Sequence, residues 1–94
     1  MNPILVTGGA KGLGAEIVRQ LAKAGHDLVI HFHTSGREAK QLVEECRAQG
    51  VLAHALFGDF TTTKGVECFI RDYMELCPRT KGLINNVGVY VSGT

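Results

Sequence analysis

The sequence predicts a three-layer α/β fold built on a parallel sheet. Short apolar runs rich in β-branched residues alternate with helical patterns of ten or more residues, and a glycine cluster follows the first run directly. Strands separated by helices of that length are joined by right-handed crossovers, which makes them parallel. A chain of 94 residues is long enough for one small domain and too short for two.

The first half of the chain contains two strand and helix pairs. The apolar run at residues 3–8 indicates a buried strand, and a helical pattern then begins at Gly12 and ends at Gly25. Residues 27–32 indicate a second strand, after which Ser35 is the expected N-cap of a second helix.

The second half continues the alternation. The inward face of the second helix is expected to carry Ala39, Leu42, Val43 and Cys46, and Gly50 ends that helix. Residues 51–57 indicate a third strand, and 82–91 the fourth strand with its exit. Between them we expect a helix, stopped by Pro78, that packs through Val66, Phe69, Ile70, Tyr73, Met74 and Cys77.

The glycine-rich loop, residues 8–14, is the main functional signal. Its glycines lie between a predicted strand and a predicted helix, where the first permits a tight turn, the second a close approach of backbone to pyrophosphate, and the third close helix packing. The helix N-terminus would offer N–H groups to phosphate oxygens. The alternative is an ordinary tight turn. No Gly-Lys-Ser/Thr closes the loop, so the sequence is not that of a nucleoside triphosphatase phosphate loop.

Three motifs resemble those of the short-chain dehydrogenases/reductases. "TGGAKGLG" (7–14) is similar to that family's T-G-x-x-x-G-x-G, "NNVG" (85–88) to its N-N-A-G, and "GDF" (58–60) to the stretch with an acid beside the adenine. The resemblance covers the whole chain but only the N-terminal, cofactor-binding half of the family. It implies that residues 1–94 are the N-terminal part of a single NAD(P)-binding Rossmann domain, truncated, with strand order 3-2-1-4.

The resemblance also implies cofactor contacts. Residues along the adenosine ribose and pyrophosphate would be Gly8, Lys11, Gly12 and Leu13, with Gly14 serving packing. Asp59 would accept a hydrogen bond from the adenine amino group, Phe60 would contribute its N–H, and Asn86 and Gly88 would line the ribose. Asn85 is expected to tie neighbouring strands together. For Asp59 the alternative is an N-cap or turn carboxylate.

The end of the second strand favours NADP(H) over NAD(H). A site for NAD usually has a carboxylate there, which binds the ribose hydroxyls. This sequence has Phe32 instead, followed by the hydrogen-bond donors His33, Thr34 and Ser35. The stretch resembles those of pteridine reductases and 3-oxoacyl-acyl-carrier-protein reductases, and Lys11 adds a cation. The alternative is that His31 and His33 are ordinary strand and surface histidines.

No catalytic residue is assigned. Reduction of a carbonyl needs a general acid, and the family carries a Ser and a Tyr-x-x-x-Lys for this purpose on its fifth strand and the helix after it. Neither has appeared by Thr94, and Tyr73 cannot replace the tyrosine because residue 77 is Cys rather than Lys. We therefore expect the cofactor-binding portion of an NADPH-dependent oxidoreductase that transfers hydride to a carbonyl substrate. A non-catalytic dinucleotide-binding module is the alternative. The least favoured functions are a methyltransferase that binds S-adenosylmethionine and a sensor related to the extended branch of the family.

Composition restricts the remaining classes. A net charge of +1 gives no electrostatic case for a nucleic acid or an anionic membrane as partner. No apolar run is long enough to span a membrane and no signal peptide is evident, which favours a cytoplasmic protein. Three cysteines without metal-ligand spacing are expected to be reduced thiols, with no metal site. A homo-oligomer is expected only for a complete chain.

Overall fold

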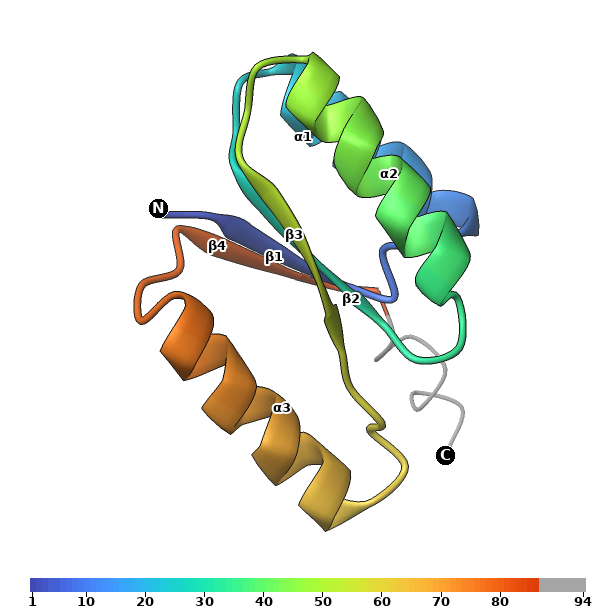
Figure 1. Cartoon of the computed structure of the whole chain (residues 1–94), viewed down its shortest axis with the longest axis vertical. Coiled ribbons are helices and arrows are strands. Elements are labelled where there is room, and N and C mark those ends of the chain that lie inside the picture. Colours follow the sequence, from blue (N-terminus) through green and yellow to red (C-terminus); the bar gives the residue numbers. More distant parts are fainter. Residues whose placement is uncertain (87–94) are drawn as a thin grey trace.

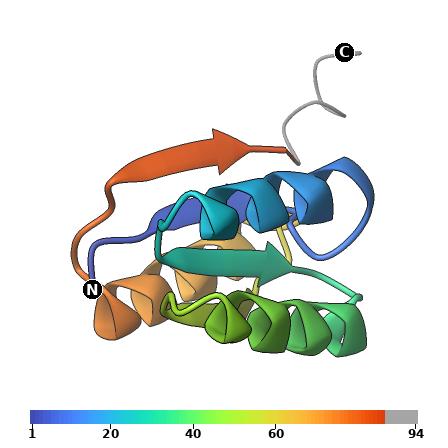
Figure 2. The same cartoon turned by 90° about the horizontal axis from the view of Figure 1, so that it is seen from above.

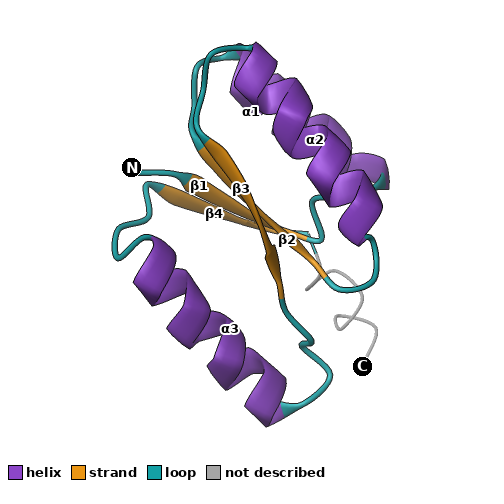
Figure 3. Cartoon of the chain, in the orientation of Figure 1, coloured by secondary structure: helices purple, strands orange, loops and turns teal. Residues whose placement is uncertain are grey.

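The computed structural model describes residues 1–86, which form a four-stranded parallel sheet between two layers of helices (Figure 1). The strands are β1 (Ile4–Thr7), β2 (Leu28–Phe32), β3 (Ala53–Phe57) and β4 (Gly82–Asn85), and the helices are α1 (Gly12–Lys23), α2 (Gly36–Ala48) and α3 (Thr63–Leu76). The strand order is β3-β2-β1-β4, which confirms the predicted 3-2-1-4 order. Helices α1 and α2 cover one face of the sheet and α3 covers the other (Figure 3).

The register places the carboxyl ends of the strands along one edge. Thr7 of β1 lies opposite Asn85 of β4, and Phe32 of β2 lies opposite Phe57 of β3. Seen from above, all the visible strand arrows point the same way (Figure 2). In such a sheet, ligands bind outside the carboxyl ends of the strands, at the point where the strand order reverses. Here that point lies at β1, which has β2 on one side and β4 on the other.

The main hydrophobic core lies under α1 and α2. It includes the fully buried side chains of Val6, Val18, Leu28 and Ile30, together with Leu42 and Cys46 of α2. The predicted inward face of α2 is therefore confirmed. Because β2 is flanked by strands on both sides and covered on both faces, its sequence is almost continuously apolar.

The predicted packing of α3 is only partly correct. Phe69 and Tyr73 are buried against Val29 in a second, smaller cluster. Ile70 and Met74 are instead 55% and 53% exposed, so the expectation that they pack in the core is wrong. Within residues 1–86, α3 lies alone on its face of the sheet, and a lone helix buries a narrower stripe than a helix with a neighbour beside it.

Two strand boundaries also differ from the prediction by more than one residue. β3 begins at Ala53 rather than at residue 51, and β4 ends at Asn85, whereas the predicted range of 82–91 continues into residues 87–94, outside the described part. Cys46 and Cys77 are buried, Cys68 is half-buried, and all three are free thiols. In the described residues no helix is long and apolar enough to cross a membrane, and no three potential ligand side chains gather as a metal site.

The position of Leu42 in the core gives a stability prediction. Leu42→Ala should lower the free energy of unfolding by about 2–5 kcal/mol, because it removes buried methyl groups and leaves a cavity. Leu52→Ala deletes the same atoms from a side chain that is 55% exposed and should cost within about 0.5 kcal/mol. Urea unfolding of the two variants measures both values, and equal losses would contradict the assignment of the core.

Candidate functional site

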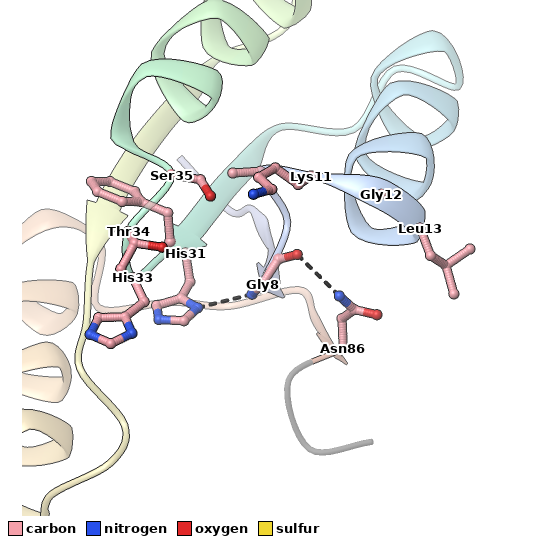
Figure 4. Close-up of a pocket in the computed structure, with 11 residues that line it drawn as sticks. Gly8, Lys11, Gly12, Leu13, His31, His33, Thr34, Ser35 and Asn86 are labelled. Atoms are coloured by element: carbon pink, nitrogen blue, oxygen red, sulfur yellow. Dashed lines mark hydrogen bonds between the residues drawn. The ribbon is translucent and has the colours of Figure 1, made fainter. Parts of the chain in front are cut away.

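A cleft of about 590 Å³ opens at the carboxyl ends of β1 and β2 (Figure 4). The glycine-rich loop forms one part of its lining, and the segment that follows β2 forms another. Eight of the predicted site residues line it: Gly8, Lys11, Gly12, Leu13, His33, Thr34, Ser35 and Asn86. The fold thus brings together segments that are far apart in the sequence.

The glycines shape the loop in two different ways. Gly8 and Gly12 have φ angles of 61° and 58°, in the left-handed region that side chains with a Cβ rarely adopt. Gly14 is needed for space, because a Cβ there would lie 2.2 Å from the Gly8 carbonyl oxygen and 2.9 Å from the Cα of Gly9. The start of α1 can therefore approach the turn only with glycine at position 14.

Gly8 is held from both sides (Figure 4). Its N–H donates to Nδ1 of His31 at 2.9 Å, and its carbonyl oxygen accepts from Nδ2 of Asn86 at 3.1 Å. The next amide, that of Gly9, donates to the His31 carbonyl oxygen at 3.1 Å. These bonds connect the loop after β1 to β2 on one side and to the end of β4 on the other.

His31 is the residue that the sequence interpretation undervalued. Its side chain is 2% exposed, its Nε2 lies 2.9 Å from the Gly58 carbonyl oxygen, and its ring stacks on Phe60 with centroids 4.1 Å apart. Burial lowers the pKa of His31, an effect that the bond to Gly58 partly opposes. A polar residue within the otherwise apolar "LVIHF" was the available signal, since a buried polar group needs partners.

The N-terminus of α1 has no side-chain cap among the described residues. Its N-cap residue is Lys11, in extended conformation, whereas at α3 the Thr62 hydroxyl accepts from the Gly65 N–H. The first N–H groups of α1 therefore depend on other partners, and they lie where the glycine-rich loop meets the cleft. A helix end of this kind favours an anion.

The side of the cleft after β2 carries imidazole and hydroxyl groups. His33 and Thr34 are exposed, and Ser35 occupies the predicted N-cap position of α2 without making a side-chain capping bond. Within residues 1–86, the residues that line the cleft include Lys11 but no Asp or Glu. The lining can therefore offer several hydrogen-bond donors and positive charge to a phosphate-bearing ligand.

Asp59 and Phe60 are placed differently from the other predicted residues, because they do not line the cleft. The Asp59 carboxylate accepts hydrogen bonds from the N–H and hydroxyl of Thr61 at 2.9 and 2.6 Å, so it is a turn carboxylate. The Thr61 bonds lower the pKa of Asp59. Its Oδ1 also lies 3.7 Å from Nε2 of His33, which connects this turn to the end of β2.

The two asparagines after β4 have separate contacts. Asn85 Oδ1 accepts from the Thr7 hydroxyl at 3.0 Å, which ties β4 to β1 as expected. Asn86 lines the cleft and also bonds Gly8. Gly88, the remaining predicted site residue, lies outside the described residues.

Comparisons with known proteins agree with this architecture. The family model for short chain dehydrogenase matches residues 2–94. The 3-oxoacyl-(acyl-carrier-protein) reductase FabG of Staphylococcus aureus is 31% identical over 85 residues, which cover 90% of this chain and 35% of that protein.

Two solved structures are also similar. A dehydrogenase from Burkholderia cenocepacia with bound NADP superposes with a TM-score of 0.81 at 32% identity, over 89% of this chain and 33% of the other. A short-chain dehydrogenase from Sphingobium yanoikuyae in complex with NADPH gives 0.78 at 29% identity, over 92% and 33%. The chain thus spans about a third of the length of these relatives.

The close approach at Gly14 gives a second prediction. Gly14→Ala should lower the free energy of unfolding by about 1–3 kcal/mol, because the new methyl group overlaps the Gly8 carbonyl and forces the backbone apart. Gly36→Ala is the matched control in the first turn of α2, where a Cβ would contact only the Phe32 ring at 3.4 Å. Thermal or urea unfolding should show that Gly14→Ala is clearly less stable than Gly36→Ala. If Gly36→Ala were the less stable variant, the packing role of Gly14 would be contradicted.

Proposed function

Because the chain belongs to the short chain dehydrogenase family, we propose that it binds a nicotinamide dinucleotide in the cleft beside the glycine-rich loop. It would act as the cofactor-binding portion of an NADPH-dependent oxidoreductase that transfers hydride to a carbonyl-type substrate. The observation that carries the proposal is the cleft itself, in which a glycine turn, an uncapped helix N-terminus and a lining without carboxylates meet.

The residues of the loop fit a pyrophosphate group. No atom of the described residues lies within 4 Å of the place that a Cβ on Gly12 would occupy, which supports a close approach of phosphate oxygens to its backbone. The N–H groups at the start of α1, including that of Leu13, would donate to those oxygens. Gly14 lets the helix begin close enough to the turn for these N–H groups to share one site.

The residues after β2 support NADPH as the preferred cofactor. An NAD site commonly uses a carboxylate at the end of the second strand, which would repel a 2′-phosphate. Here Phe32 ends β2, and His33, Thr34, Ser35 and Lys11 line the cleft around that point. Two of the similar solved structures carry NADP or NADPH, which is consistent with this choice.

Other predicted contacts are part of the same proposal. The Asp59 carboxylate would accept a hydrogen bond from the adenine amino group, through lone pairs that the Thr61 bonds leave available. Phe60 would contribute its N–H. Asn86 would line the ribose beside Gly8, and Gly88 would lie next to it.

The bound cofactor would supply the hydride, but reduction of a carbonyl also needs a proton donor above its oxygen. Tyr73 does not suit this task, because its hydroxyl shares a hydrogen bond of 2.6 Å with Thr80 and burial raises its pKa. The sequence contains no Tyr-x-x-x-Lys. This observation favours a second candidate function, in which these 94 residues bind a dinucleotide without catalysing hydride transfer themselves.

One experiment separates these two functions. The chain is mixed with NADPH and a panel of ketones, and the loss of NADPH fluorescence is followed over time. Binding without turnover supports the binding module for these residues, whereas turnover supports the oxidoreductase. Absence of binding to either NADPH or NADH would contradict both.

The loop assignment predicts a specific loss of binding. Gly12→Val should abolish NADPH binding, because the side chain fills the space left open for phosphate and strains a residue with φ of 58°. Gly25→Val is the matched control, since Gly25 has φ of 94°, is equally open, and follows α1 at the opposite end of the sheet. Both variants should lose about 1–2 kcal/mol of stability. Calorimetric titration should find no NADPH binding in Gly12→Val and the native NADPH affinity in Gly25→Val.

The NADPH preference predicts a change in cofactor ratio. Lys11→Met should weaken NADPH binding by about tenfold, the effect of losing one charge-assisted contact, and leave NADH binding nearly unchanged. Lys23→Met, at the other end of α1, should change neither affinity. Titrations with the two cofactors at the same salt concentration measure the ratio. An equal loss of both affinities in Lys11→Met would place the lysine at the pyrophosphate instead.

A further inference from the structure

The buried imidazole of His31 joins the glycine-rich loop to the loop after β3. Both of its ring nitrogens have backbone partners, the Gly8 N–H at Nδ1 and the Gly58 carbonyl at Nε2, each at 2.9 Å. The side chain itself does not reach solvent, being 2% exposed. His31 lies among the residues that line the cleft, but both of its ring nitrogens are engaged by backbone groups, so its main role is to connect backbone segments.

The partners of the ring determine its protonation state. The Gly8 N–H can only donate, so Nδ1 must carry a lone pair. The Gly58 carbonyl can only accept, so Nε2 must carry the hydrogen. The arrangement thus requires the neutral imidazole with its hydrogen on Nε2, and a second proton on Nδ1 would set two donors against each other.

The ring has little freedom to adopt another position. Phe60 stacks on one face with an interplanar angle of 5°, and Phe69 meets it edge-on at 5.3 Å between centroids. A Cβ on Gly58 would lie 3.0 Å from the imidazole and 2.7 Å from Phe69, so position 58 leaves no spare space either. Loss of the Gly8 bond therefore cannot be repaired by a simple rotation of the ring.

We propose that neutral His31 is the positioning residue for the dinucleotide site, and that its protonation releases Gly8 and weakens binding of NADPH and NADH alike. The inference rests on the proposed function. Gly8 is the point of transmission, because its N–H is held by His31 while its carbonyl is held by Asn86, and both it and Asn86 line the cleft. Release of the Gly8 N–H loosens the turn whose backbone would approach the cofactor, which then keeps only the Asn86 bond and the bond of the Gly9 N–H to the His31 carbonyl among those named here.

The electrostatic surroundings support a neutral ring at neutral pH. Burial is the main cause that lowers the pKa of His31, and the charge of His33 adds to it, while the Gly58 carbonyl opposes both. Charged groups also come from the neighbouring loops. Lys11 lies on the glycine-rich loop at the same cleft, and Asp59 lies beside His33, whereas α3 contributes the apolar Phe69.

The direction of the pH effect follows from the lowered pKa. An unfolded chain takes up a proton on His31 as the pH falls through about 6.5, whereas the folded chain keeps the ring neutral to lower pH. The unfolded state binds more protons in that interval, so acid lowers stability there. Below the pKa of the folded chain, the affinity for cofactor should fall by about tenfold per pH unit.

Two substitutions separate positioning from simple core packing. His31→Asn keeps an oxygen near the place of Nδ1 that can accept from Gly8, and it does not titrate. His31→Leu keeps a buried side chain of similar size but leaves the Gly8 N–H without an acceptor. NADH is the probe, since it has no 2′-phosphate whose own titration would change binding.

His31→Leu should bind NADH at least about fivefold more weakly than the native chain, the effect of one unpaired buried donor. His31→Asn should bind within about threefold of the native chain and lose the decline of affinity in acid. Unchanged NADH affinity in His31→Leu, or an undiminished acid decline in His31→Asn, would overturn the proposal. Urea unfolding verifies that each variant is folded at the pH of the titration.

A measurement without cofactor distinguishes failure of this inference from failure of the proposed function. The imidazole nitrogen chemical shifts should identify hydrogen on Nε2 alone, and the Gly8 amide signal should move with the protonation of His31 in the native chain but not in His31→Asn. If these signals behave so while NADH and NADPH do not bind, the dinucleotide function is wrong and the positioning of Gly8 stands. Hydrogen on Nδ1 at neutral pH would refute the positioning role directly.

Discussion

The geometry of the site depends on the two hydrogen bonds that hold Gly8. Its N–H is bound by the side chain of His31 and its carbonyl by that of Asn86, so a single residue of the turn is fixed by the two strands that flank β1. Strands of a parallel sheet carry their connections on the faces and leave the carboxyl ends open. Without these side-chain bonds, the glycine turn would have greater conformational freedom at the point where its backbone lines the cleft.

A small shared cluster supports that arrangement from the other face of the sheet. The imidazole contacts both Phe60 and Phe69, and Phe69 in turn packs beside Tyr73 with 6.1 Å between ring centroids. Helix α3 therefore contributes to the cleft although none of its residues lines it. The same contacts keep the ring out of water, which disfavours its charged form.

Charge is distributed around the cleft in a way that suits an anionic ligand. Lys11 and His33 line it, while the carboxylate that comes nearest to His33, that of Asp59, is occupied by the two donors of Thr61. The hydroxyls of Thr34 and Ser35 complete the side after β2. Ser35 lies at the start of α2, makes no side-chain capping bond to that helix, and lines the cleft.

The sequence by itself determined the parallel α/β fold and the position of the glycine-rich loop, because hydrophobic periodicity and glycine spacing are local properties. The strand order is not a local property, and it was expected only from the resemblance of the motifs to those of a known family. It also identified most residues that line the cleft. The tertiary structure decided the rest: that Ile70 and Met74 stay exposed on a helix without a neighbour in the described residues, and that Asp59 bonds to its own turn. The role of His31 depended on the fold as well, since its partners Gly8 and Gly58 are 23 and 27 residues away in sequence and meet it only when β1, β2 and β3 are side by side.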